Sequence, residues 1–306
     1  MPSEGAGEPR FTLDLVADWH QLFANHFMVN AFLGGTLVAI VAGAVGWFMV
    51  LRGQSFAGHT LAEVGFAGAT GAALVGLPPV IGLMAVGIVT ALGISALTHR
   101  QRGSARAQAA TIGTVQIFGL GLGLLFLRLA SSSYGGGVYA VLFGTILGVS
   151  DRDVAVIALT ATLALLVLIV VARPLFFASV QPLTAAARGI PVRGLGTVFL
   201  VLLAVAVAQA VQIVGVLLIF ALLVTPAAIA QHLTTRPGYG VPLAVSLALL
   251  FTWAALTIAY YTPYPVGFVL TSCAFGTYLL MRLARLVWDR RRPRRRTILV
   301  APGDAA

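Results

Sequence analysis

Residues 51–73 read Leu-Arg-Gly-Gln-Ser-Phe-Ala-Gly-His-Thr-Leu-Ala-Glu-Val-Gly-Phe-Ala-Gly-Ala-Thr-Gly-Ala-Ala, and the rest of the chain is interpreted outward from them. One long apolar segment ends at Arg52, and the next carries His59 and Glu63. These two residues are four positions apart, so on a helix both side chains stand on one face. Glu63 is the only acidic residue between positions 18 and 151. A carboxylate in a membrane helix costs about 2.5–3.5 kcal/mol to insert, which indicates that Glu63 has a function.

The composition is that of a membrane protein. Hydrophobic residues make up 59% of the chain and charged residues only 9%, with a mean hydropathy of +0.98, whereas soluble domains carry about 25% charged residues. Long apolar runs favour helices over a closed barrel. We therefore expect an all-α polytopic protein. Residues 28–286 form the membrane domain, after an N-terminal tail and interfacial amphipathic helix (1–27) and before a basic cytoplasmic tail (287–306).

Nine stretches have about the 20 residues that a membrane-spanning helix needs. The count falls to eight if 194–231 forms one hairpin with a broken helix. Residues 131–152, rich in serine and glycine, fit a re-entrant or outer-surface segment. The nine predicted spans are 28–51, 57–76, 79–98, 109–130, 153–172, 194–210, 212–231, 239–261 and 264–286.

The basic residues predict the orientation. All 19 are arginine, and most lie at the ends of predicted spans or in the tail. Because arginine-rich loops stay in the cytoplasm, the N-terminus should be outside and the C-terminal tail inside. The net charge of +10 suits membrane orientation and anionic lipid as a partner rather than nucleic acid.

His59 and Glu63 are the candidate metal ligands. An imidazole and a carboxylate suit a divalent first-row ion such as zinc or manganese, and a pair at this spacing can share one ion. A hydrogen bond between helices, or an ion pair between Glu63 and an arginine, would explain the same residues without a metal.

Residues 173–193 form the longest internal cytoplasmic segment that the sequence predicts. Pro182 can start a short helix, and the run from Gly189 to Pro191 can stop it. A short helix lying parallel to the membrane would be a docking element, although an ordinary loop is the alternative.

Pro226 lies inside the predicted span 212–231, where a proline interrupts the helical hydrogen bonds. Broken helices line the substrate route in many transporters, so Pro226 is a candidate hinge beside a pathway. The alternative is a simple kink, which membrane helices tolerate.

Several functions are disfavoured by what the sequence lacks. There is no lysine, so there is no P-loop and no ATP hydrolysis by that route. No catalytic triad or HExxH motif is present, and no permanent cofactor is expected. We therefore expect a transport subunit and not an enzyme. The alternatives are a proton-coupled secondary transporter that uses Glu63 as proton carrier, and a membrane scaffold that transports nothing.

Four stretches are similar to motifs of one known family. Residues 52–63 follow Arg-x-x-Ser-Phe-x-Gly-Asp-Ala-Leu-Ser-His in part, and 143–150 follow Phe-Gly-Ser-Ile-Leu-Gly-Val-Ser. Residues 181–192 follow a Pro…Gly-Ile-Pro-Val segment, and 214–228 match Val-Gly-Val-Leu-Leu-Val-x-Ala-Leu-Leu-Val-x-Pro-Ala-Ala closely. Over about residues 32–286, the chain resembles the permease subunits of bacterial zinc/manganese/iron ABC importers.

Two features depart from the family pattern. The family's aspartate and histidine ligands, four residues apart, map onto His59 and Glu63 in reversed order, and the coupling segment lacks the family's acidic residues. The ligand types are kept, but the family's metal preference does not transfer directly.

The resemblance implies a homodimeric type II ABC importer-like permease in a bacterial cell membrane. Its partners would be cytoplasmic ABC ATPase subunits and an extracytoplasmic metal-binding protein, and its cargo a divalent metal, zinc first and manganese next. The metal ligands would be His59 and Glu63, and the hinge Pro226. The residues that couple to the ATPase would be Gln181, Pro182, Arg188, Gly189, Ile190 and Pro191.

Overall fold

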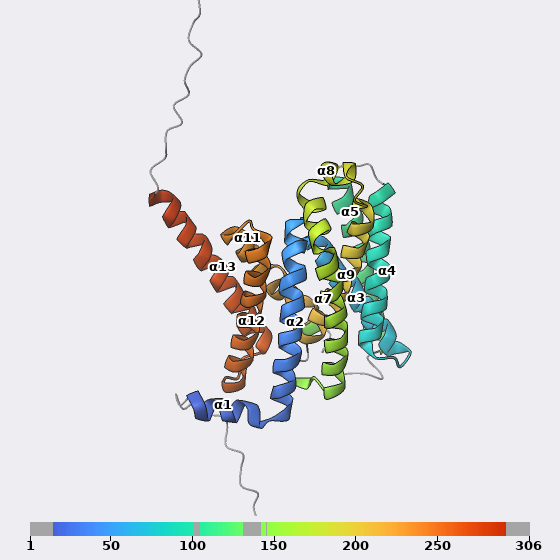
Figure 1. The fold of residues 1–306 in the computed structure, drawn as a ribbon. Coiled ribbons are helices and arrows are strands. Elements are labelled where there is room, and N and C mark those ends of the chain that lie inside the picture. Colours follow the sequence, from blue (N-terminus) through green and yellow to red (C-terminus); the bar gives the residue numbers. More distant parts are fainter. Residues whose placement is uncertain (1–14, 101–104, 131–141, 145, 292–306) are drawn as a thin grey trace, which may run out of the picture.

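The described chain is helical throughout (Figure 1). A computed structural model describes residues 15–100, 105–130, 142–144 and 146–291. The predicted tail before residue 15, most of the re-entrant segment and the tail after residue 291 lie outside these ranges. The helices are α1 (Leu15–Ala24), α2 (His26–Leu51), α3 (Ser55–Leu74), α4 (Pro79–Arg100), α5 (Ala105–Ala130), η1 (Ile146–Gly148), α7 (Asp151–Val180), α8 (Pro182–Ala187), α9 (Val192–Val214), η2 (Val216–Leu218), α10 (Ile219–Leu223), α11 (Thr225–Leu233), α12 (Pro237–Tyr261) and α13 (Val266–Arg291).

Seven helices in the described residues are long and apolar enough to cross a membrane: α2, α4, α5, α7, α9, α12 and α13. They coincide with seven of the nine predicted spans. The other two correspond to α3, a 20-residue helix with more polar and small residues, and to the interrupted segment from η2 to α11. A count of nine full spans is therefore not confirmed, although α3 runs alongside α4 in Figure 1.

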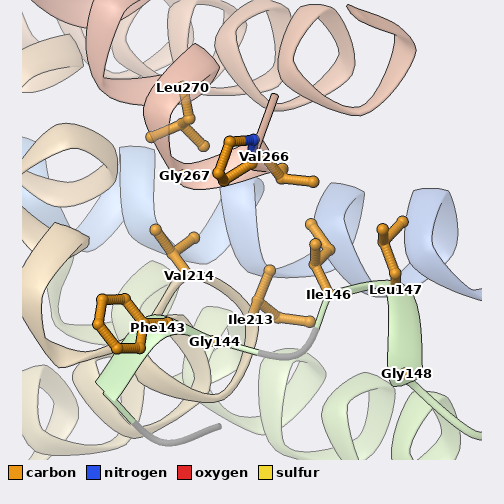
Figure 2. Close-up of a pocket in the computed structure, with 11 residues that line it drawn as sticks. Phe143, Gly144, Ile146, Leu147, Gly148, Ile213, Val214, Val266, Gly267 and Leu270 are labelled. Carbon is orange, nitrogen blue, oxygen red and sulfur yellow. The ribbon is translucent and has the colours of Figure 1, made fainter. Parts of the chain in front are cut away.

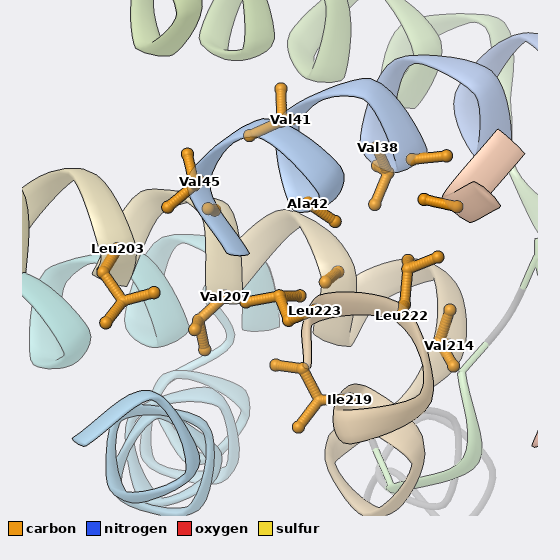
Figure 3. Packing of buried hydrophobic residues seen from close by; sticks show 14 of the residues in the cluster. Val38, Val41, Ala42, Val45, Leu203, Val207, Val214, Ile219, Leu222 and Leu223 are labelled. Carbon is orange, nitrogen blue, oxygen red and sulfur yellow. The ribbon is translucent and has the colours of Figure 1, made fainter. Parts of the chain in front are cut away.

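Helix α2 is the centre of the bundle. It is buried on nearly all sides, because its sequence is rich in glycine, alanine and valine. In Figure 3, Ala42 of α2 points toward Leu222 and Leu223 of α10. Small residues let helix backbones approach closely in lipid. At Gly43, an added Cβ would lie 2.6 Å from the Cα atom of Val245 on α12.

Helix α3 packs between α4 and α5 through glycines. Gly68 of α3 and Gly82 of α4 face each other so closely that a Cβ on either would overlap the carbonyl oxygen of the other. A Cβ on Gly119 of α5 would overlap the side chain of Val64, and one on Gly123 would overlap the ring of Phe66. These contacts pack the helix that carries His59 and Glu63 closely against α4 and α5.

We expect Gly82→Ala to destabilise the protein, because the new methyl group would force α3 and α4 apart. Overpacking of this kind typically costs about 1–3 kcal/mol. The matched control is Gly93→Ala on the same helix, where a Cβ meets nothing within 4 Å. Thermal unfolding in detergent should show a clear loss of stability for Gly82→Ala only. Equal stability of the two variants would contradict the close-packing role.

The two ends of the bundle carry different short helices. Helix α1 lies across the foot of α2, as expected for an interfacial helix, and α8 lies at the opposite end (Figure 1). The predicted N-terminal segment 1–27 contains α1, but the chain bends at Asn25, and residues 26–27 already belong to α2. Leu22 of α1 is buried, and the ring of Phe23 lies 5.2 Å from that of Phe32.

Three helices extend beyond the predicted spans. Helix α7 does not end at 172 but runs for 30 residues to Val180 with Pro174 inside it, so 173–180 is helix and not loop. Helix α9 runs to Val214 instead of 210. Helix α13 continues through 287–291, which were assigned to the tail. Residues 175–178 and 213–214 are as apolar as the predicted spans before them, whereas 289–291 are Asp-Arg-Arg, so apolar sequence explains only the first two extensions.

Candidate metal-binding site

The predicted ligand pair forms on α3. The Nε2 atom of His59 lies 3.0 Å from Oε1 of Glu63, and the side chains are 26% and 16% exposed. Donor atoms around a tetrahedral zinc ion with bonds of about 2.0–2.1 Å lie about 3.3 Å apart. The pair is therefore close to the separation at which both atoms can bind one ion. The alternative to a metal site, a hydrogen bond, also occurs, but within α3 and not between helices.

The second imidazole nitrogen is left without a partner. The Nδ1 atom of His59 is buried and makes no hydrogen bond. With the proton on Nε2, the contact with Glu63 is a hydrogen bond donated by the imidazole; with the proton on Nδ1, the Nε2 lone pair is free to share a cation with Oε1 of Glu63. A buried polar atom without a partner is uncommon in folded proteins and indicates a ligand or a functional strain.

Phe220 of α10 covers this imidazole. The two ring centroids are 4.9 Å apart at an interplanar angle of 49°. A small pocket beside them is lined by residues of α2, α3 and α10 and by Val224, namely Met49, Ser55, Gly58, His59, Ile219, Phe220, Leu223 and Val224. Within the residues that the structure describes, no third histidine, cysteine or carboxylate joins the pair. One chain thus supplies two conventional metal ligands here.

The segment that carries Phe220 is broken twice. Helix α9 ends at Gly215, whose φ of +89° suits glycine. A short 3₁₀ turn and α10 follow, and a second break at Val224 separates α10 from α11. The prediction of a broken helix is confirmed. Its position needs correction, because the wider break is at Gly215 and not at Pro226.

Pro226 is buried in the first turn of α11. A proline there loses no helical hydrogen bond, because the first N–H groups of a helix have no partner inside it. Pro226 therefore starts a helix and does not kink a continuous one. Its hinge role stays a prediction.

We expect Pro226→Ala to slow transport more than it lowers stability. Alanine restores an N–H at 226 and allows α10 and α11 to join into one helix, which would stiffen the segment that covers His59. The initial rate of metal uptake in reconstituted vesicles, compared with the melting temperature, measures both effects. Wild-type rates would leave Pro226 without a hinge role.

The predicted coupling segment forms the short helix α8 as expected. Pro182 is its first residue, and Gly189 with a φ of +79° follows its end. Ala185 is fully buried against the chain, whereas Leu183 is 87% exposed. The guanidinium of Arg188 lies 5.5 Å from the ring centroid of Phe177. Gln181 links α7 to α8, and the chain returns through Ile190 and Pro191 into α9.

A larger cavity, of about 310 Å³, lies next to the break at Gly215. Figure 2 shows Ile213 and Val214 on one side and Val266, Gly267 and Leu270 of α13 on the other. No charged, histidine or cysteine side chain lines it, so it does not fit a metal site. Neither this cavity nor the position of Phe220 could be predicted from the sequence. Both depend on contacts between segments far apart in the chain, α13 with 213–214 at the cavity and α10 with α3 at Phe220.

Comparison with known proteins identifies the family. The ABC 3 transport family matches residues 24–285. The chain is 31% identical over 231 residues to the manganese transport system membrane protein MntC of Halalkalibacterium halodurans, covering 76% of each chain. It is 32% identical over 252 residues to the manganese import system permease protein ScaB of Streptococcus parasanguinis, covering 82% of this chain and 88% of that one. PsaBC from Streptococcus pneumoniae, solved in complex with a Fab, has a similar structure, with a TM-score of 0.78 and 28% identity over 89% of this chain and 99% of that chain.

The fold and these likenesses define a membrane permease, that is, a transport subunit without enzymatic activity. The chain belongs to the ABC 3 transport family. It is a multi-pass protein of the bacterial plasma membrane and a permease of metal ABC importers, as the family resemblance of its motifs predicted.

Proposed function

We propose that this permease carries a divalent first-row metal ion inward past His59 and Glu63, driven by separate ATPase subunits. The observation that carries the proposal is the His59–Glu63 pair, with Nε2 and Oε1 3.0 Å apart and the buried Nδ1 unpartnered. Manganese is the first candidate, because two relatives are named for manganese. Zinc, which the sequence favoured, suits the imidazole better and is tested beside it.

The site would be completed by a second copy of the chain. One chain brings two ligands, and most metal sites need four or more. A homodimer that places both pairs on one pathway would supply four. Few and exchangeable ligands also suit a site that must release its ion.

The partners follow from the class of protein. The chain has no lysine and thus no P-loop, so ATP must be hydrolysed by other subunits. Helix α8 suits their docking, with Gln181, Pro182, Arg188, Gly189, Ile190 and Pro191 shaping the segment around it. An extracytoplasmic metal-binding protein would deliver the ion at the opposite end, near α1. Anionic lipid around the arginine-rich end would fix the orientation.

The test is metal uptake by the permease reconstituted with its ATPase subunits and loaded binding protein. Manganese, zinc and iron(II) compete in one assay. The assay is run with and without ATP on the side of the membrane where the ATPase subunits lie. We expect uptake to require ATP and to be inhibited most by the preferred ion. Uptake that needs a proton gradient and no ATPase would instead support the secondary-transporter alternative. Absence of uptake under every condition would support a scaffold.

A further inference from the structure

Arg52 contacts two helices besides its own, α7 and α9. It caps the C-terminus of α2 and stands three residues before α3 begins. Its Nη1 donates a hydrogen bond to Oγ of Ser179 at 2.9 Å, and its guanidinium carbon lies 5.4 Å from the ring centroid of Phe199. Ser179 is in the last turn of α7, and Phe199 is in the second turn of α9.

These two contacts lie on either side of the coupling helix. Helix α7 leads into α8, and α9 leads away from it. A Cβ on Gly196, one turn before Phe199, would lie 3.5 Å from Nη2 of Arg52, so the guanidinium fits closely against α9. Arg52 therefore touches both arms that hold α8, and its own backbone starts the turn into the helix that carries His59 and Glu63.

The environment of Arg52 is costly for a residue that only ends a helix. Its Nε is buried without a hydrogen-bond partner, and no carboxylate within the described ranges forms an ion pair with it. Burial lowers the pKa of the guanidinium from its ordinary value. Arg52 is half-buried, so its charge is partly removed from water without an opposite charge among the described residues to compensate. Membrane orientation accounts for an arginine at this end of α2, but not for its contacts with both α7 and α9.

We propose that Arg52 is a positioning residue that transmits movement of α8 to α3, and so links ATP hydrolysis to the metal ligands. The inference rests on the proposed function. When the ATPase displaces α8, the end of α7 and the start of α9 move with it. The planar guanidinium, bonded to one arm and stacked on the other, passes that displacement to the corner between α2 and α3. A lysine keeps the charge but has neither the flat stacking face nor the fixed donor geometry.

The test uses the complete transporter with its ATPase subunits in proteoliposomes and measures metal transported per ATP hydrolysed. We expect Arg52→Lys to lower this ratio about tenfold, the scale of one lost charge-assisted hydrogen bond, while ATP hydrolysis stays within about twofold of wild type. The matched control is Arg236→Lys, an exposed arginine at the start of α12, which should change neither. Ser179→Ala should lower the ratio less, and adding it to Arg52→Lys should have little further effect.

The outcomes are distinct. Equal loss of ATP hydrolysis, transport and thermal stability in Arg52→Lys would show a structural role only and overturn the inference. So would an unchanged ratio, or additive effects of Arg52→Lys and Ser179→Ala. Failure of the proposed function would be seen in a different measurement, because the wild-type transporter would then take up metal without ATP.

Discussion

Glu63→Gln is expected to abolish metal uptake while the protein still folds and inserts. Glutamine keeps the size of the side chain and can still hydrogen-bond to His59, but it removes the charge that binds the cation. Because a neutral amide is cheaper to place in the membrane than a carboxylate, expression and thermal stability should be equal to wild type or higher. Uptake of radioactive manganese or zinc in vesicles measures the loss, which we expect to exceed the roughly 10–100-fold that loss of an outer-shell partner costs a metal site.

The exchange of the two ligands tests whether type or geometry matters. His59→Asp combined with Glu63→His restores the order found in the family motif that the chain resembles. If the ligand set alone matters, the double variant should transport at a rate near wild type. A folded but inactive double variant would show that Phe220 and the surrounding pocket fit an imidazole at 59 only. Wild-type uptake by Glu63→Gln would remove the pair from the pathway altogether.

Ala186→Pro is expected to uncouple ATP hydrolysis from transport. Proline inside a helix costs about 3 kcal/mol or more, because it removes a hydrogen bond and clashes with the preceding turn. Helix α8 is only six residues long, so this change should unfold it, while the bundle below it stays intact. Transport should fall to background while the ATPase subunits continue to hydrolyse ATP.

A second variant separates docking from helix breaking. Leu183→Glu changes a side chain that is 87% exposed, so the fold should not respond. If α8 docks into the ATPase subunits, the charge should weaken their co-purification with the permease. Thr184→Ser on the same helix serves as the control. Normal coupling in both Ala186→Pro and Leu183→Glu would show that the ATPase docks elsewhere.

The local features of the site could be predicted from the sequence, and the tertiary ones could not. The pairing of His59 with Glu63 depends only on helical spacing, so it followed from the residues themselves. The short helix α8 followed from Pro182 and Gly189 for the same reason. Phe220 was missed because the break at Gly215 brings α10 onto α3, and no periodicity in the sequence records that approach.

For the fold as for the site, features set by local sequence could be predicted, and features set by tertiary packing could not. Apolar length identified the seven spanning helices, since the membrane imposes that length. It could not place the end of α7, because residues 175–178, Leu-Phe-Phe-Ala, are as apolar as the span before them. The two phenylalanines instead pack on neighbouring parts of the protein, Phe176 against Trp47 and Phe177 against Arg188. Hydropathy does not distinguish burial in lipid from burial in protein.

The length of α7 has a mechanical consequence. Thirty residues at about 1.5 Å each give a rod of about 45 Å, which is about 15 Å more than the hydrocarbon layer needs. The excess forms a stiff lever that holds α8 away from the lipid. Tilting a rod of this length by about 10° moves its tip sideways by about 8 Å. A small rotation of α7 within the bundle therefore corresponds to a large movement of an ATPase subunit docked at α8. Pro174, eight residues before α8 begins, lacks the amide hydrogen of a regular helix, so a bend at that point would move only the short end of α7 beyond it.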